Sequence, residues 1–177
     1  ATSPFGAGVE VRGVGVAAIV NNVSIQGPQA GVTVDGGASI GTIASSGQIS
    51  ASFGAAPALQ VFGSVSAISN SGVVTASGGS AAGLAVDSPG VVAIIINLGG
   101  GTIESLGGGA FGMLLSGTVG SVSNQAGGVI ESSGGGAIGI ESLGSVSSIL
   151  NAGTVVVDGA STNAVALLQG SMGSFGN

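Results

Sequence analysis

The stretch Ser64–Gly72 reads Ser-Val-Ser-Ala-Ile-Ser-Asn-Ser-Gly, and it recurs along the chain. Close copies lie at residues 39–47, 118–124 and 145–153, and weaker ones at residues 16–21, 92–97 and 171–177. Every copy has a polar residue, here called the anchor, at the same place: Asn21, Ser45, Asn70, Asn97, Asn124, Asn151 and Asn177. Successive anchors lie 24, 25, 27, 27, 27 and 26 residues apart, and such a fixed period is typical of a repeat architecture.

Apolar residues keep fixed distances from these anchors. Five positions before the anchor stand Val16, Ile40, Val65, Val92, Val119, Val146 and Met172. Two positions before it stand Ile19, Ile43, Ile68, Ile95, Val122, Ile149 and Phe175. A third apolar position follows the anchor and holds Ile25, Ile49, Val74, Ile103, Ile130 and Val155. Each repeat therefore places the same residue types in the same columns.

A further pattern lies midway between anchors, where a small residue is followed by an aliphatic one. The small column holds Gly8, Gly31, Ala58, Gly83, Gly112, Gly139 and, in our alignment, Ala166. The aliphatic column holds Val9, Val32, Leu59, Leu84, Met113, Ile140 and Leu167. The column two positions further on holds Val11, Val34, Val61, Val86 and Leu115. In the last two repeats the same column holds the polar residues Ser142 and Gln169.

These patterns predict strands and turns. Each repeat has three short β-branched runs separated by Gly and Ser, and no segment keeps an apolar period of 3.6 residues. Such short strands bury their apolar sides only when one repeat stacks on the next. We expect an all-β, parallel β-solenoid with three short strands per coil and about 6.5–7 coils, right-handed as parallel crossovers usually are. The chain is expected to form one domain, residues 1–177, whose first coil, residues 1–21, is incomplete.

The composition excludes most catalytic and metal-binding chemistry. The 177 residues include 38 glycines, one cation (Arg12) and no His, Cys, Trp or Tyr, and the net charge is −6. General bases, activated nucleophiles and the ligand sets of zinc, haem or iron–sulfur clusters are therefore missing. A chain of this charge is unsuited to a phosphate backbone, and no apolar run reaches the ~20 residues of a membrane-spanning helix. We expect no enzyme, no cofactor, no metal, no nucleic-acid partner and no transmembrane segment.

The repeated phrase Ser-Val/Ile-x-x-Ile-x-Asn-x-Gly-x-Ile, set between tracts of Gly, Ala and Ser, resembles the passenger domains of bacterial autotransporters. The resemblance extends from Gly6 to Asn177. It implies a secreted β-solenoid at the bacterial cell surface, of which this chain would be a fragment or a processed piece. Cell-surface or matrix components are then possible partners.

We expect the asparagine column to be structural. Its members are Asn21, Asn70, Asn97, Asn124, Asn151 and Asn177. They stand where the backbone must turn, and asparagine tolerates the left-handed conformation. Its side-chain amide can also bond to the asparagine one coil away. Ser45 should occupy the same corner with a weaker bond.

The seven acids offer little chemistry. Glu104 and Glu131 lie one period apart and should stack roughly 5 Å apart on an outer face. We expect solvated surface residues there, with cation bridging as an alternative and glycoside cleavage as a remote one. Arg12 is expected to pair with Glu10 on the same face of its strand.

The two ends of the sequence suggest self-association. Neither end shows a charged cap, and such caps block the stacking of solenoids. We expect Phe5, Val9, Met172 and Phe175 to lie in the end layers, where copies could stack head to tail into a structural or adhesive filament, extracellular or at the cell surface. The alternative is a piece of a longer passenger that serves as a monomeric spacer, and a remote one is a carbohydrate-active or surface-binding β-helix.

Overall fold

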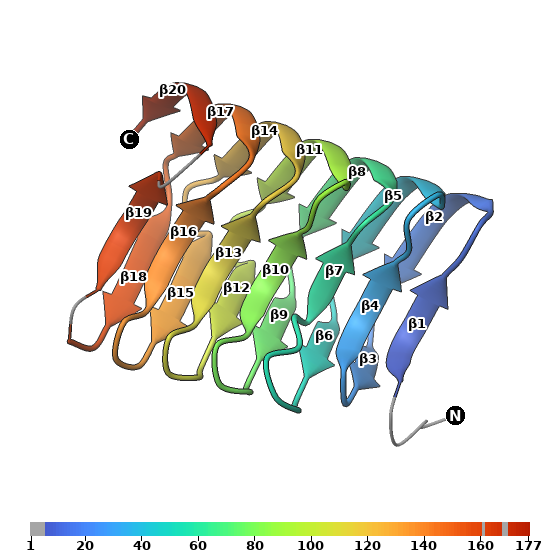
Figure 1. The fold of residues 1–177 in the computed structure, drawn as a ribbon, viewed down its shortest axis with the longest axis horizontal. Coiled ribbons are helices and arrows are strands. Elements are labelled where there is room, and N and C mark those ends of the chain that lie inside the picture. Colours follow the sequence, from blue (N-terminus) through green and yellow to red (C-terminus); the bar gives the residue numbers. More distant parts are fainter. Residues whose placement is uncertain (1–5, 161, 168–169) are drawn as a thin grey trace.

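The computed structural model describes residues 6–160, 162–167 and 170–177, and it is a parallel β-solenoid of about six turns (Figure 1). Every regular element in these residues is a strand, and each coil contributes one strand to each of three parallel sheets. The all-β solenoid with three strands per coil is therefore confirmed. The described part of the chain contains no helix long and apolar enough to cross a membrane.

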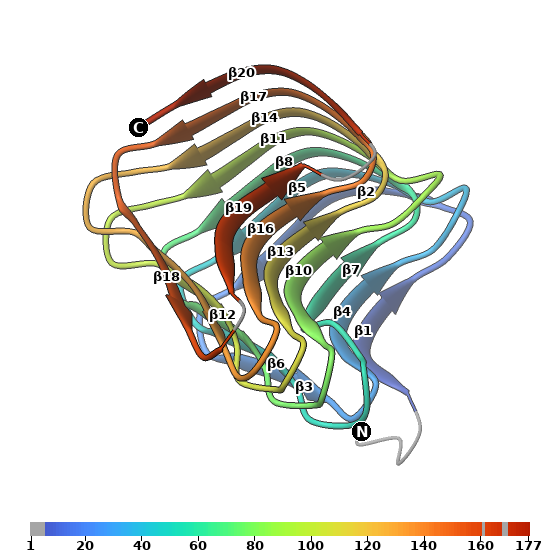
Figure 2. The same ribbon diagram turned by 60° about the vertical axis from the view of Figure 1, so that its left-hand side comes forward.

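The chain visits the three sheets in a fixed order, and Figure 2 shows the strands of each sheet lying one behind another. Sheet A contains β1 (Ala7–Val11), β4 (Ala30–Val34), β7 (Leu59–Val61), β10 (Ala82–Val86), β13 (Phe111–Leu115), β16 (Ile138–Ser142) and β19 (Asn163–Leu167). Sheet B contains β2 (Gly15–Asn21), β5 (Ser39–Ser45), β8 (Ser64–Asn70), β11 (Val91–Asn97), β14 (Thr118–Asn124), β17 (Ser145–Asn151) and β20 (Ser171–Gly176). Sheet C contains β3 (Ser24–Gly27), β6 (Gln48–Ala51), β9 (Val73–Ala76), β12 (Thr102–Ser105), β15 (Val129–Ser133) and β18 (Thr154–Asp158).

The sequence columns become stacks inside the solenoid. In sheet B, Ile95 lies in register with Ile68 on one side and Val122 on the other, and all three side chains are at most 2% exposed. Sheets A and C bury their own aliphatic columns in the same cluster. Because parallel strands lie about 4.8 Å apart, like side chains meet along the axis and form one continuous dry core.

The small column is explained by the approach of sheets A and C. A Cβ added to Gly83 would lie 2.7 Å from the carbonyl oxygen of Glu104, and one on Gly112 would lie 2.7 Å from Cγ2 of Ile130. Real Cβ atoms do not make contacts this short with fixed backbone. The glycines of the column are therefore explained by the lack of room for a Cβ, independently of any turn, whereas Ala58 shows that one coil has space for a methyl group.

The predicted alignment of the last coil is wrong by two residues. The structure pairs Ile140 with Val165 and Ser142 with Leu167, so Val165 occupies the aliphatic column in place of Leu167. Ala164 accordingly occupies the small column in place of Ala166. Gln169, which the alignment placed in the third column, lies outside the described residues. The turn before this coil is shorter than the alignment assumed, which shifts the strand by one in–out period.

Candidate functional site

The asparagine column lies inside the solenoid at the end of the sheet B strands. Asn70 and Asn97 are 1% and 0% exposed. Each side-chain nitrogen Nδ2 donates to the side-chain oxygen of the next anchor along the chain. The donor–acceptor pairs are Asn21–Ser45 (3.0 Å), Asn70–Asn97 (2.9 Å), Asn97–Asn124 (2.9 Å), Asn124–Asn151 (2.8 Å) and Asn151–Asn177 (2.7 Å). All these bonds therefore point in one direction along the axis.

The same amides also bind the backbone of the turn that leads into sheet C, which the sequence did not reveal. Asn97 Nδ2 donates to the carbonyl of Gly101 at 3.0 Å and to that of Val129 at 3.0 Å. The corresponding acceptors one coil away on either side are the carbonyls of Thr102 for Asn70 and of Thr154 for Asn124. The carbonyl of Gly101 also accepts from the backbone N–H of Val129 at 2.9 Å. The asparagine amides therefore find their partners among backbone oxygens that the coil already holds in place.

Ser45 interrupts the column. Its Oγ accepts the bond from Asn21 and donates to the carbonyl of Gly47 at 3.2 Å. Asn70, the next anchor, receives its bond at Oδ1 from the backbone N–H of Gly72 at 3.2 Å. The short serine side chain fits the corner, but it does not carry the side-chain bonds across to the next coil.

The predicted left-handed backbone at the anchors is wrong. Each described anchor from Asn21 to Asn151 ends a strand of sheet B. Among the described residues, the non-glycine residue with a positive φ is Ser80, at 56°. Glycines such as Gly100 (φ 87°) and Gly127 (φ 81°) supply the left-handed positions of the turns after Asn97 and Asn124. Asparagine stands at the anchors because of the polar groups it satisfies inside the solenoid.

The proposed end-stacking residues lie at opposite ends of the molecule. Val9 belongs to the first strand of sheet A, whereas Met172 and Phe175 belong to the last strand of sheet B. Val9 and Met172 are half-buried against the core, and Phe175 is 47% exposed. Phe5 lies outside the described residues. Val9 therefore does not meet Met172 or Phe175 within one chain, and each end of the solenoid has apolar surface.

Glu104 and Glu131 lie side by side on the outer face of sheet C, in register on β12 and β15. Their half-buried side chains have Thr75 and Val156 as the next residues in the same row. No group of three or more acids, histidines or cysteines is close enough to hold a metal ion in the described part of the chain. Two carboxylates without further ligands make a poor cation site.

Arg12 has one more partner than the sequence indicated. Its guanidinium contacts the carboxylate of Glu10, as expected, and its Nε lies 3.0 Å from Oδ2 of Asp35 in the next coil. Glu10 and then Asp35 raise the pKa of this guanidinium by hydrogen bonds and charge. The pairs are exposed and add little stability, but they place the single cation on sheet A, away from the acids of sheet C.

Glu141, whose burial is unusual for a carboxylate, was not singled out from the sequence. It stands on β16 between Leu114 and Ala166 of the neighbouring coils and is only 5% exposed. Burial raises the pKa of its carboxyl above the ordinary value of 4.5. Within the described residues, no hydrogen bond or positive charge offsets that desolvation. The sequence pattern placed this position outside the core and gave no sign of its burial.

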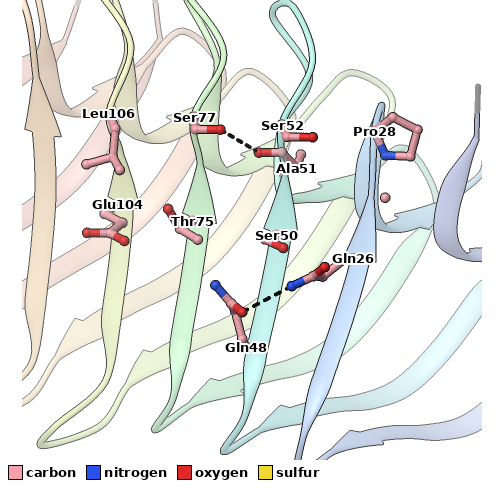
Figure 3. Close-up of a pocket in the computed structure, with 11 residues that line it drawn as sticks. Gln26, Pro28, Gln48, Ser50, Ala51, Ser52, Thr75, Ser77, Glu104 and Leu106 are labelled. Atoms are coloured by element: carbon pink, nitrogen blue, oxygen red, sulfur yellow. Dashed lines mark hydrogen bonds between the residues drawn. The ribbon is translucent and has the colours of Figure 1, made fainter. Parts of the chain in front are cut away.

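An open groove of about 580 Å³ lies on the outer face of sheet C, across β3, β6, β9 and β12 (Figure 3). Its polar lining comes mainly from Gln26, Gln48, Ser50, Thr75 and Glu104. This groove was also missed, because it depends on how side chains of different coils line up across the sheet.

No family model, curated protein or solved structure matches this chain.

Proposed function

We propose that this chain is a non-enzymatic structural rod that associates end to end, at the bacterial cell surface or outside the cell. One register runs through seven strands of sheet A and seven of sheet B. A parallel sheet edge can accept a further strand in that same register. The observation that carries the proposal is therefore the continuous stack itself, with half-buried apolar layers at both ends.

The direction of the asparagine bonds supports association between unlike ends. Every Nδ2 donates toward the following coil, so the first coil offers the acceptor Asn21 Oδ1 and the last coil offers the donor Asn177 Nδ2. A head-to-tail contact continues this pattern, whereas contacts between like ends set donor against donor or acceptor against acceptor. Head-to-tail contacts of this open kind build filaments.

The resemblance of the repeat to autotransporter passengers supports the extracellular location and also a second candidate. The same coils could continue in a longer passenger, where this segment acts as a monomeric stalk that spaces or presents other parts. The continuous register favours both candidates equally, and they differ in whether isolated copies of the chain associate.

Electron microscopy and light scattering of the purified chain over a concentration series test the proposal. We expect unbranched fibres and a scattering mass that grows with concentration. A constant mass of 16.1 kDa, that of one chain, would reject end-to-end association and leave the stalk.

Two matched variants separate end contacts from general solubility. Phe175→Lys places a charge in the last layer, and Val91→Lys places one on the outer face of a central coil. The two residues are 47% and 44% exposed. Because Phe175 lies in register with the buried Ile149, urea denaturation of both variants checks that the coils remain folded. We expect Phe175→Lys to abolish fibres and Val91→Lys to retain them. Equal loss in both variants would contradict association through the ends.

A further inference from the structure

The groove on sheet C owes its shape to one row of side chains. Gln26, Ser50, Thr75 and Glu104 occupy the same register position on four successive strands. The two short residues, Ser50 and Thr75, lie between the two long ones, so the open groove is deepest in the middle and bordered by a long side chain at each end (Figure 3). With strands about 4.8 Å apart, the row spans roughly 14 Å along the solenoid axis.

The hydrogen-bonding groups of the groove are nearly all neutral. Gln26 and Gln48 contribute amides that both donate and accept, and the bond between them is a long 3.4 Å, which a competing group can replace. The hydroxyl oxygen of Thr75 is buried and has no hydrogen-bond partner. Rotation about χ1 would turn this hydroxyl outward toward an occupant of the groove. Glu104 adds a carboxylate that can only accept.

The charge distribution excludes several classes of occupant. Glu104 is the single charged residue of the groove lining, and Arg12 is engaged by Glu10 and Asp35 on sheet A. An anionic chain would meet a carboxylate and no cation. A peptide strand pairs with a free sheet edge. At the groove that edge is β3, and a strand added there would lie beside β3 and not across β6 and β9, which are paired on both sides. Pro28, Ala51 and Leu106 add apolar surface to the lining, so an occupant needs C–H surface as well as hydrogen-bonding groups. A purely apolar ligand would leave the amides and hydroxyls without partners.

We propose that this groove binds a neutral oligosaccharide, lying along the solenoid axis across β3 to β12. A linear trisaccharide is about as long as the row and offers hydroxyls as both donors and acceptors. The amides of Gln26 and Gln48 and the hydroxyls of Ser50 and Thr75 bond these hydroxyls, and Glu104 accepts from one more. The chain has no Trp or Tyr, so no ring stacks on the sugar and each groove binds weakly, in the millimolar range.

Saturation-transfer difference NMR tests the proposal, with cellotriose, maltotriose and chitotriose as neutral probes and trigalacturonate as the anionic comparison. The signal is read on the saccharide, so the measurement works equally with single chains and with fibres. We expect at least one neutral trisaccharide to give a signal and trigalacturonate to give none. No signal from any neutral probe, or an equal signal from trigalacturonate, would overturn the proposal without bearing on end-to-end association.

Two pairs of variants locate the binding. Ser50→Gln fills the middle of the groove and should abolish the signal, whereas Ser147→Gln makes the same change at an exposed site of sheet B and should preserve it. Glu104→Gln should weaken binding about tenfold through the lost charged acceptor. Glu131→Gln, in the same row one strand outside the groove, should leave it unchanged. Binding that survives Ser50→Gln, or that falls equally in the control variants, would show that the groove is not the site.

Discussion

Two regions of this solenoid bury polar side chains, and they do so under opposite conditions. In the asparagine column, the amide of Asn97 is fully buried and bonds to Asn124 and to two backbone carbonyls. On strand β16, Glu141 and Ser142 are 5% and 0% exposed. Burial raises the pKa of Glu141, and the hydroxyl of Ser142 has no hydrogen-bond partner. Both regions occupy positions that recur from one coil to the next.

The difference shows what a repeat can stabilise. A buried hydrogen bond contributes about 1 kcal/mol, whereas a buried polar group without a partner costs about 1–3 kcal/mol. An asparagine gains a partner from each neighbouring coil when the neighbours are asparagines too. Glu141 stands between Leu114 and Ala166, and Ser142 between Leu115 and Leu167, so their neighbours offer no polar group in return. Repetition therefore stabilises the column and penalises the isolated polar residues of β16.

The largest effect is expected from Asn97→Asp. This change replaces a donor by an oxygen that faces the carbonyls of Gly101 and Val129, and it buries a charge. We expect the free energy of unfolding to fall by about 3–5 kcal/mol at neutral pH, as when a buried charge is left uncompensated. Urea denaturation measures the change, and Asn22→Asp, at an exposed turn residue, is the control that should show almost none. Equal stability of the two variants would mean that the column is not rigidly bonded.

The second effect concerns Ser142, which replaces an aliphatic residue of the third column of sheet A. Ser142→Val restores the residue type found at Val61 and Val86 and removes the unpartnered hydroxyl. We expect stabilisation of about 1–2 kcal/mol, measured as a higher urea midpoint with an unchanged slope. Ser142→Ala removes the hydroxyl without adding volume and should give the smaller share of the gain. Destabilisation by both variants would show that the hydroxyl has a partner in solution.

The third effect is a pH-dependent one at Glu141. Glu141→Gln removes the charge that burial disfavours, and we expect it to stabilise the chain at neutral pH by on the order of 1 kcal/mol. Urea denaturation at several pH values measures the gap between variant and parent. Glu131→Gln, on the half-buried outer row of sheet C, is the matched control and should change stability little.

The sign of this pH dependence follows from the raised pKa. Well below pH 4.5, the ordinary value, Glu141 is protonated in both the folded and the unfolded chain, and the gap between parent and variant should be at its smallest. As the pH rises, the unfolded chain ionises first, so the parent loses stability relative to Glu141→Gln. The gap levels off once the pH exceeds the raised pKa of the folded state. A gap that instead widens toward acid would mean that a cation stabilises the carboxylate.

The same contrast explains what could be predicted from the sequence. The anchors and the aliphatic columns recur at fixed spacing, so their stacking followed directly from the period. The register of the last coil could not be predicted in this way. Ala164-Val165-Ala166-Leu167 alternates small and aliphatic residues, so a slip by two residues leaves the same pattern facing inward. The burial of Glu141 depends on its neighbours one coil away.

The groove on sheet C and the Asp35 contact of Arg12 also required the cross-coil register. The row consists of residues that lie 24 to 29 positions apart in the sequence: Gln26, Ser50, Thr75 and Glu104. Their side chains differ in length, but this difference predicts a groove only when the register of the strands is known. The row becomes visible when the outward positions are aligned by the same period as the inward ones.

The smallest effect, and the most direct test of the comparison, is expected from Ser45→Asn. The turn after Ser45 has the same Ser-Gly sequence as the turn after Asn70, so an asparagine at position 45 fits the corner. Its oxygen would accept from Asn21 and its nitrogen would donate to Asn70, which closes the interruption. We expect a gain of about 0.5–1 kcal/mol in urea denaturation. The gain should shrink when Asn70 is changed to Ser, because the two side chains then no longer bond. An equal gain in both backgrounds would attribute the effect to the corner itself and not to the continuity of the column.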